Sequence, residues 1–213
     1  MDEQTISALN RYVTELFAPE DDVLLSIQET TRQNDMPQIS LAPQEGRLLQ
    51  FLVHATGAHK AVEIGTLAGY SGTWLARALP DDGKLWTLEV SSKHAAVARA
   101  NFERAGLSHK VELLEGPALD SLKKIEPQGP FDFVFIDADK PGYPHYLEWA
   151  VVNLRPGGMV TAHNAFRGGR VIAPSSEEDR GMVDFNRLLA ADDRLFSTIL
   201  AIGDGMAAGI KKD

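Results

Sequence analysis

The 213-residue sequence contains no cysteine. This absence excludes disulfides, thiolate metal sites, haem attachment and cysteine nucleophiles. No apolar run approaches the roughly 18 residues that a membrane helix needs, and the chain opens with the acidic pair Asp2 and Glu3, where a signal peptide would be basic. We therefore expect a cytoplasmic protein without a membrane segment.

Basic side chains are also in short supply. The chain has 21 lysines and arginines against 30 aspartates and glutamates, a formal net charge of −9. This balance argues against a broad phosphate-binding surface and so against a nucleic-acid partner. Local basic pairs such as Lys123-Lys124 and Lys211-Lys212 still leave contact with a tRNA open.

The first 55 residues predict a helical arm and cap. Apolar residues recur at helical spacing through Ile6, Leu9 and Val13, and a second helix is expected after Pro19. The stretch over 43–54 resumes the same spacing. We expect this arm to precede a core over 56–213, within one domain.

From Lys60 onward, short apolar runs alternate with longer amphipathic segments. Strands are predicted at 61–64, 85–88, 111–114, 131–136 and 159–162, with helices around 71–79, 92–105, 117–125, 143–153 and 182–191. A hairpin is predicted from 195–202 and 206–210, joined at Gly203-Asp204-Gly205. The pattern indicates an α/β, Rossmann-like doubly wound fold: a mostly parallel seven-stranded sheet with a reversed C-terminal strand and helices on both faces.

Ligands of such sheets bind beyond the carboxyl ends of the strands, so the residues there are the candidates for chemistry. Glycines punctuate the loop after the first strand, Glu63-Ile64-Gly65-Thr66-Leu67-Ala68-Gly69-Tyr70-Ser71. Their spacing matches neither the dinucleotide G-x-G-x-x-G nor a P-loop, which disfavours a dehydrogenase and a phosphate ligand. Glu63 suits an ammonium group, although an ordinary strand-to-helix turn is the alternative.

Glu89 closes the second strand, about 20 residues beyond the glycine loop, where a carboxylate can accept hydrogen bonds from both hydroxyls of a ribose. Taken alone, such a residue is often a helix cap. Gly116-Pro117-Ala118 offers either a wall for a nucleoside base or a plain helix start. Together with the glycine loop, these residues favour a nucleoside-containing cofactor.

Charged and metal-ligating side chains follow the fourth and fifth strands: Asp137, Asp139 and Lys140 after one, His163 and Asn164 after the other. If these strands are neighbours, Asp137, His163 and Asn164 converge on one cation, with Lys140 close by. The alternatives are a solvated turn with a local ion pair and a capping turn.

These segments carry a family resemblance. The glycine loop, the run from Phe131 to Lys140 with Tyr143 and Tyr146 behind it, Leu154-Arg155-Pro156-Gly157-Gly158, His163-Asn164 and Gly203-Asp204-Gly205 resemble bacterial S-adenosylmethionine-dependent O-methyltransferases related to caffeoyl-coenzyme A and catechol O-methyltransferases. The resemblance is nearly full length and includes the helical arm. It implies a single class I methyltransferase domain over 1–213 and a homodimer.

The resemblance also implies a role for each site residue. The cofactor site would be lined by Glu63, Gly65, Ser71, Glu89, Ala118 and Asp137, with Glu89 on the ribose and Ala118 beside adenine. Lys140 would act as the base, with Asp137 as the second catalytic residue. A divalent metal, Mg²⁺ or Mn²⁺ in the family, would be held by Asp137, His163 and Asn164.

This chain departs from the family at His163, because the family normally has Asp-Asn at the end of the fifth strand. Imidazole removes a negative charge and offers a softer ligand than the oxygens that Mg²⁺ prefers. The outcomes are a shift toward Mn, Fe, Ni or Zn, weak binding, or a metal-free enzyme. We expect a retained site with an altered metal preference.

The predicted activity is metal-assisted methyl transfer to a hydroxyl of a small aromatic, catechol-like or phenolic acceptor. Candidate acceptor walls are Tyr143, Trp149, Phe166 and Arg167, although aromatic residues at such places are more often part of the core. The polar segment 174–180 is a loop that either covers the site or is simply solvated. Two alternatives stay open: methylation of a tRNA hydroxyuridine, and a cofactor-binding protein with an impaired metal site.

Overall fold

The computed structural model describes residues 2–213, and it begins with three helices. They are α1 (Glu3–Phe17), α2 (Asp22–Gln33) and α3 (Pro43–Thr56). Asp2 and Asp21 cap the first two, each accepting a hydrogen bond from a backbone N–H three residues on. The helical arm predicted from apolar spacing is confirmed.

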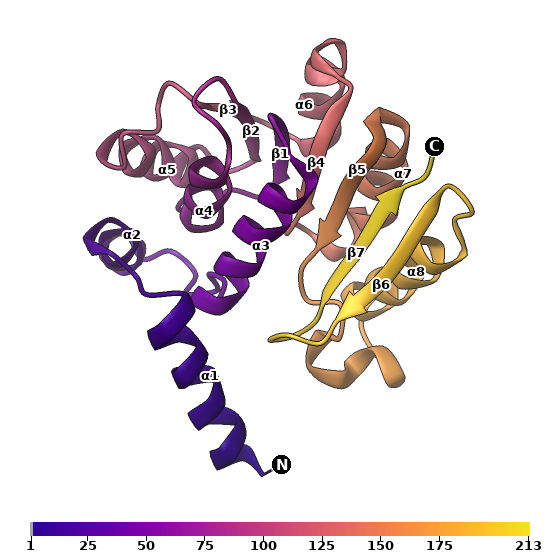
Figure 1. Cartoon of the computed structure of the whole chain (residues 1–213), viewed down its shortest axis with the longest axis horizontal. Helices are drawn as coiled ribbons and strands as arrows, with labels where there is room; N and C mark the ends of the chain where they lie inside the picture. Colours follow the sequence, from indigo (N-terminus) through magenta and orange to yellow (C-terminus); the bar gives the residue numbers. More distant parts are fainter. Residues whose placement is uncertain (1) are drawn as a thin grey trace.

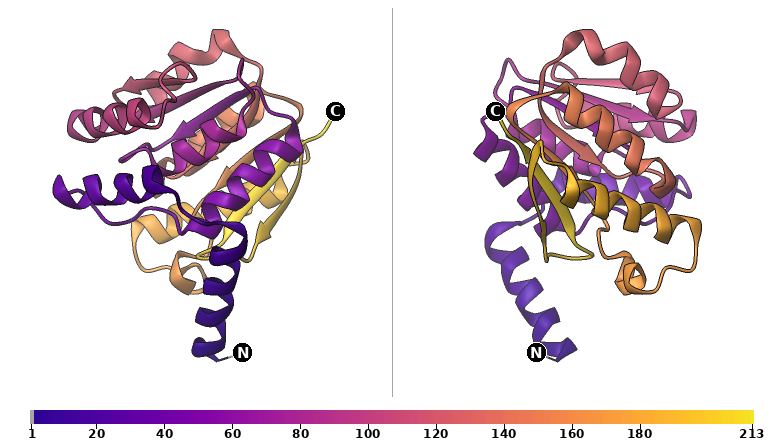
Figure 2. Two further views of the ribbon diagram at one scale, coloured as in Figure 1. Left: turned by 60° about the vertical axis from the view of Figure 1, so that its left-hand side comes forward. Right: turned by 90° about the vertical axis from the view of Figure 1, so that its right-hand side faces the viewer.

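Helix α1 projects away from the rest of the molecule (Figures 1 and 2). Ile6, Leu9, Tyr12, Leu16 and Phe17 on it are all exposed, with Phe17 at 62%. Its C-terminal half joins the body through Thr14, whose hydroxyl hydrogen-bonds Gln44 of α3 at 3.1 Å. The amphipathic spacing that predicted this helix therefore leaves an apolar surface uncovered in the single chain.

Seven strands form one sheet: β1 (Lys60–Ile64), β2 (Lys84–Glu89), β3 (Val111–Glu115), β4 (Phe131–Ile136), β5 (Leu154–Ala162), β6 (Leu195–Leu200) and β7 (Met206–Lys211). Their order is β3-β2-β1-β4-β5-β7-β6, and the reversed strand, β7, runs antiparallel to both of its neighbours, β5 and β6. The predicted sheet with one reversed strand is confirmed. The strand order reverses between β1 and β4, which is where such sheets bind ligands.

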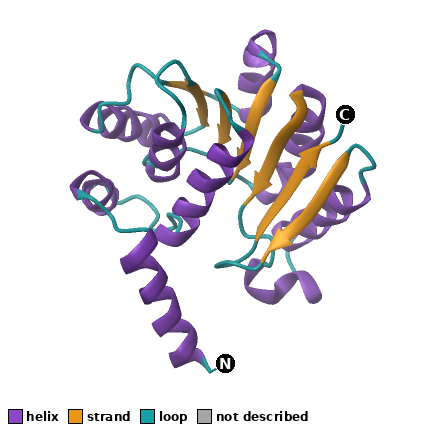
Figure 3. Ribbon diagram, viewed as in Figure 1, coloured by secondary structure: helices purple, strands orange, loops and turns teal. Residues whose placement is uncertain are grey.

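Helices cover both faces of the sheet (Figure 3). They are α4 (Tyr70–Ala78), α5 (Ser92–Arg104), α6 (Ala118–Ile125), α7 (Tyr143–Asn153) and α8 (Glu177–Ala191), with short 3₁₀ turns η1 (Glu126–Gln128), η2 (Lys140–Gly142) and η3 (Arg167–Ile172). Alternate side chains of the central strand β4 pack against the helices on the two opposite faces of the sheet. Phe133 and Phe135 pack with α3 and α4, whereas Val134 and Ile136 pack with α7 and α8. A strand buried on both faces reads as a continuous apolar run.

Two predicted boundaries differ from the structure. Helix α8 starts at Glu177, five residues earlier than expected, because Ser176 and Asp179 form a reciprocal capping box inside the predicted polar loop. Strand β5 starts at Leu154, so it includes the expected Leu154–Gly158 turn, and Leu154 pairs with Phe131 across a register shift. None of the described helices is both long and apolar enough to span a membrane.

Candidate active site

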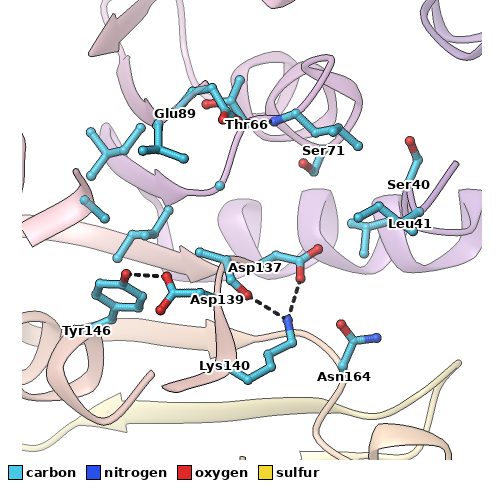
Figure 4. Close-up of a pocket in the computed structure, with 18 of the residues that line it drawn as sticks. Ser40, Leu41, Thr66, Ser71, Glu89, Asp137, Asp139, Lys140, Tyr146 and Asn164 are labelled. Atoms are coloured by element: carbon cyan, nitrogen blue, oxygen red, sulfur yellow. Dashed lines mark hydrogen bonds and ion pairs between the residues drawn. The ribbon is translucent and has the colours of Figure 1, made fainter. Parts of the chain in front are cut away.

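A cavity of about 820 Å³ lies at the carboxyl ends of the parallel strands (Figure 4). Its volume falls within the range of roughly 300–1,000 Å³ found for small-molecule sites. Seven of the nine predicted site residues line it: Gly65, Ser71, Glu89, Ala118, Asp137, Lys140 and Asn164. The other two, Glu63 and His163, are buried and do not line it. The sheet thus brings together residues spread over 100 positions of the sequence.

The glycine loop lies between the ends of β2 and β4. Gly65 donates its backbone N–H to Leu88 at 3.0 Å, and the N–H of Asp137 donates to Ile64 at 2.8 Å. Gly65 has a φ of 102°, and a Cβ there would overlap the carbonyl oxygen of Asp137. Glycine is required at this position because both the backbone angle and the close approach exclude a side chain.

Glu89 is fixed at the rim of the cavity by backbone donors. Its Oε2 accepts from the N–H of Leu67 at 2.8 Å, and its Oε1 accepts from the N–H of Ser91 at 2.9 Å. The residue is only 7% exposed but lines the cavity. Each carboxylate oxygen has a further lone pair, so the side chain can still accept from a ligand. The loop that precedes α4 therefore orients the acidic residue that follows β2.

Glu63 lies behind the cavity wall. Its carboxylate accepts from the hydroxyls of Ser71 and Thr87, each at 2.6 Å. Burial raises the pKa of Glu63 to about 7, against the lowering effect of those two hydrogen bonds. Ser71 stands between Glu63 and the cavity, so the structure places Ser71 at the surface of the site and Glu63 beneath it.

Lys140 begins η2, and its ammonium lies beside Asp137 (Figure 4). Nζ donates to Asp137 Oδ1 at 3.0 Å, to the carbonyl of Ala138 at 3.2 Å and to the hydroxyl of Tyr143 at 2.6 Å. Asp139 does not share in this set, since it accepts from Gly142 N–H and from the Tyr146 hydroxyl. Asp137 and Tyr143, and not Asp139, therefore hold the Lys140 ammonium in place.

His163 contacts a residue that the sequence did not single out, Glu45 of α3. The two lie 118 positions apart, and His163 Nε2 is 3.0 Å from Glu45 Oε1. On the other side of the ring, Nδ1 is 3.3 Å from Asp137 Oδ2, at ion-pair distance but without hydrogen-bond alignment. In the sequence, Glu45 has the pattern of an ordinary acidic residue in a first helical turn, so no local signal distinguishes it.

These contacts shift the pKa values of both His163 and Asp137. Burial acts to lower the pKa of His163, but the hydrogen bond to Glu45 and the negative charges of Asp137 and Glu45 outweigh it and raise the value to about 9. For Asp137, burial acts to raise the pKa, and His163 and Lys140 outweigh it, so the pKa lies below its ordinary value. The charged forms of these groups stabilise one another.

Asn164 is held by the loop between β6 and β7. Its Nδ2 donates to Asp204 at 3.2 Å, and Asp204 also accepts from the N–H of Gly168 at 2.6 Å. A Cβ on Gly203, whose φ is 52°, would overlap the Glu45 carboxylate. The Gly203-Asp204-Gly205 segment thus serves the site as well as the turn.

The residues expected to bind a divalent cation do not form a fitting donor set. An imidazole that binds a metal presents the lone pair of one nitrogen to it, whereas each nitrogen of His163 faces a carboxylate. Asp137 already contacts Lys140 through one oxygen and His163 through the other. Within residues 2–213, no group of three or more His, Asp and Glu side chains is arranged to hold a metal.

Of the four expected acceptor walls, only Arg167 lines the cavity. Tyr143 is fully buried beneath Lys140, and Trp149 packs on Phe131 while donating to Glu126. Phe166 packs close to Gly205. Sequence analysis missed the residues from before α3, Ile39, Ser40 and Leu41, which close the opposite side of the cavity. The helical arm therefore contributes directly to the site.

Comparisons with known proteins agree with this geometry. Residues 14–212 match the O-methyltransferase family. The chain is 43% identical over 221 residues to a catechol O-methyltransferase of Niastella koreensis, covering 100% of both chains. It is 32% identical to caffeoyl-CoA O-methyltransferase 2 of Petunia hybrida, covering 93% of this chain and 88% of that one.

Solved structures show the same similarity. The O-methyltransferase of Bacillus cereus in complex with SAH superposes with a TM-score of 0.91 at 40% identity, covering 98% of this chain and 99% of that one. TomG of Streptomyces achromogenes, an O-methyltransferase involved in tomaymycin synthesis and solved with SAM, gives a TM-score of 0.93 at 34% identity, with 100% of both chains covered.

Proposed function

This chain belongs to the family of S-adenosylmethionine-dependent O-methyltransferases, and we propose that its methyl acceptor is a hydroxyl of a small, catechol-like aromatic molecule. The observation that carries this proposal is the position of Lys140. Lys140 lines the cavity beyond the end of β4, with its ammonium 3.0 Å from Asp137 Oδ1, on the side where a cofactor and an acceptor would meet.

The proposed cofactor contacts use the other half of the cavity. Glu89 accepts from the ribose hydroxyls, and Ala118, the first residue of α6, lies beside adenine. Gly65 and Asp137 lie along the methionine portion. Ser71 faces that portion directly, with Glu63 behind it to balance the charge of the amino group. The similarity to proteins solved with SAM and SAH supports this placement.

Methyl transfer is an in-line displacement at the sulfonium. The bond from the acceptor oxygen to the methyl carbon forms as the carbon–sulfur bond breaks, the sulfonium becomes a thioether, and the hydroxyl proton must leave. We assign that proton to Lys140. The neutral amine of Lys140 accepts that proton and becomes an ammonium beside Asp137. Positioning in the cavity lowers the remaining barrier.

Lys140 must be neutral when it takes the proton. In the free protein its nitrogen has three acceptors, which matches the three hydrogens of an ammonium. The acceptor therefore reacts only in protein molecules whose Lys140 ammonium has first released a proton to solvent. The divalent cation expected from the sequence has no part in the proposal, because its donor set does not fit.

An assay of product formation tests the proposed acceptor. Purified protein is incubated with S-adenosylmethionine and, separately, with catechol, caffeoyl-coenzyme A and tRNA carrying a hydroxylated uridine. We expect SAH and methylated catechol in equal amounts. Transfer to the tRNA alone would establish the second candidate, which the net charge of −9 disfavours. Binding of SAH with no transfer to any acceptor would indicate a protein that only binds the cofactor.

We propose further that two copies associate through α1. The exposed apolar residues along this projecting helix have no cover in the single chain, and burying them against a second copy removes them from water. The family resemblance favours the same state. Light scattering after gel filtration should give twice the chain mass, and Leu9→Glu combined with Leu16→Glu should give the monomer. A monomeric parent protein would refute this assembly.

A further inference from the structure

Four charged side chains form a continuous row at the acceptor end of the cavity, and three of them are buried. Glu45 contacts His163, His163 contacts Asp137, and Asp137 contacts Lys140, at 3.0, 3.3 and 3.0 Å. Glu45, His163 and Lys140 are 5%, 7% and 6% exposed, whereas the side chain of Asp137 is 23% exposed and faces the cavity. Buried charged groups are stable only when paired and hydrogen-bonded. The row satisfies that condition with groups of the protein alone.

Counting donors and acceptors along the row shows what His163 does. A neutral imidazole has one N–H and one lone pair, and a lone pair directed at a carboxylate oxygen would be repelled. Nε2 of His163 is hydrogen-bonded to Glu45 at 3.0 Å and Nδ1 lies at ion-pair distance, 3.3 Å, from Asp137. A carboxylate on each side of the ring favours the form that carries an N–H on both nitrogens. The row then holds two negative and two positive groups and is neutral overall.

The protein around the row is shaped to keep Glu45 in place. Its second oxygen accepts from the N–H of Ala42 at 2.8 Å, which ties the carboxylate to the start of α3. Its first oxygen lies against Gly203, where any side chain would collide with it. Three separate elements, the start of α3, the end of β5 and the loop after β6, therefore position the His163 ring.

We propose that His163, held between Glu45 and Asp137, takes the place of a divalent cation beside Lys140, so that methyl transfer by this chain requires no divalent cation. This inference deepens the proposed function and rests on it. His163 supplies a cationic group next to Asp137, and Glu45 is the positioning residue that keeps the ring there. The proton of the acceptor still goes to Lys140.

Metal binding and metal dependence test the inference separately. Mn²⁺ and Mg²⁺ are titrated into the SAH-bound protein by calorimetry, and turnover is measured with EDTA and with each cation added. We expect no saturable binding, and turnover in EDTA within about twofold of that with either cation. Stoichiometric cation binding, or a loss of turnover of roughly tenfold or more in EDTA that one cation restores, would overturn the proposal.

His163→Asp should reverse this behaviour. The substitution replaces the ring by a carboxylate, which together with Asp137 and Asn164 gives an oxygen donor set suited to Mg²⁺ or Mn²⁺. We expect saturable cation binding and turnover that depends at least about tenfold on the added cation. His109→Asp is the matched control, since His109 is exposed and precedes β3 at the opposite edge of the sheet. A His163→Asp protein that folds but binds no cation would contradict the assignment of the cation position.

Glu45→Gln tests the positioning role. The amide keeps the shape of the side chain but loses its charge, so the His163 ring is held less firmly. We expect kcat to fall roughly 10- to 100-fold, the range typical of groups that orient a functional side chain, with the SAH dissociation constant unchanged. A variant that merely loses stability would show lower kcat and lower SAH affinity together, in step with its melting temperature. An unchanged kcat would remove Glu45 from the reaction.

Different results would overturn the proposed function and the role proposed for His163. If no acceptor is methylated under any condition, the proposed function is wrong, and the calorimetric titration of cations still decides whether His163 occupies the cation position. If catechol is methylated only with an added cation, the proposed function stands and the inference fails.

Discussion

The two halves of the cavity are built in different ways. The cofactor half is formed by the ends of β1, β2 and β3, and it relies on backbone groups: the Gly65 loop, two N–H donors to Glu89 and the start of α6. The acceptor half lies at the ends of β4 and β5, and it relies on side-chain charges that reach Glu45 on α3.

This difference explains why the two halves tolerate change differently. A backbone site depends on φ and ψ angles and on close approach, so it resists most side-chain substitutions and fails where a glycine is lost. A buried row of charges depends on each member, because removing one leaves its partner unpaired. His163, the residue that departs from the pattern expected of the family, lies in this second half.

Gly65→Ala should have the largest effect, because Gly65 lies where the two halves meet. The added Cβ overlaps the Asp137 carbonyl and the φ of 102° strains any other residue, so we expect a loss of roughly 2–5 kcal/mol in the free energy of unfolding. SAH binding should also be lost. Urea denaturation and calorimetry measure both effects.

Gly57→Ala is the control for that experiment. Gly57 also has a positive φ, 60°, but a Cβ there meets nothing within 4 Å. We expect it to lose only about 1–2 kcal/mol and to bind SAH normally. Equal effects at the two glycines would show that backbone angle, and not contact between the halves, limits the site.

Lys140→Met should disable the acceptor half alone. Removing the amine takes away the proton acceptor, and general-base catalysis typically contributes about 10²–10⁴-fold in turnover. The SAH dissociation constant should stay within about twofold of the parent value. Steady-state kinetics and calorimetry separate the two, with the exposed Lys124→Met as control. Turnover close to that of the parent protein would exclude Lys140 as the base.

Glu89→Gln should weaken the cofactor half alone. The amide accepts fewer hydrogen bonds than the carboxylate, and a hydrogen bond to a charged group contributes about 1.5–3 kcal/mol. We therefore expect SAH affinity to fall roughly 10- to 100-fold, while kcat at saturating cofactor changes little. The exposed Glu112→Gln on β3 is the comparison. A fall in kcat with unchanged SAH affinity would contradict the assignment of Glu89 to the cofactor half of the cavity.

Glu63→Gln should give the smallest change, visible as a pH dependence of stability. The pKa of Glu63 is raised to about 7 in the folded protein, so its contribution is present at low pH and is lost as pH rises through that value. The parent protein should lose roughly 1 kcal/mol more than the variant between about pH 6 and about pH 8. Parallel pH profiles in urea denaturation would show that Glu63 titrates normally.

Periodicity and spacing predicted most of the architecture. The seven strands, their βα alternation and the reversed β7 followed from local apolar patterns, because each strand must bury its own side chains. The start of α8 did not follow, since the capping box of Ser176 and Asp179 resembles a polar loop until Arg167 and Arg170 pair with Asp179. The acceptor walls at Tyr143, Trp149 and Phe166 were also misplaced, because aromatic residues near strand ends are buried as readily as they line a pocket.

The sequence by itself determined the class of the sheet, the glycine loop and the carboxylates and lysine at the strand ends. Each of these depends on residues close together in the chain, where spacing fixes which way a side chain or an amide points. Only the tertiary structure decided what His163 does. Its ring faces Glu45 and Asp137 because α3 packs over the ends of β4 and β5. An electrostatic contact between residues 118 positions apart produces no periodic pattern in the sequence.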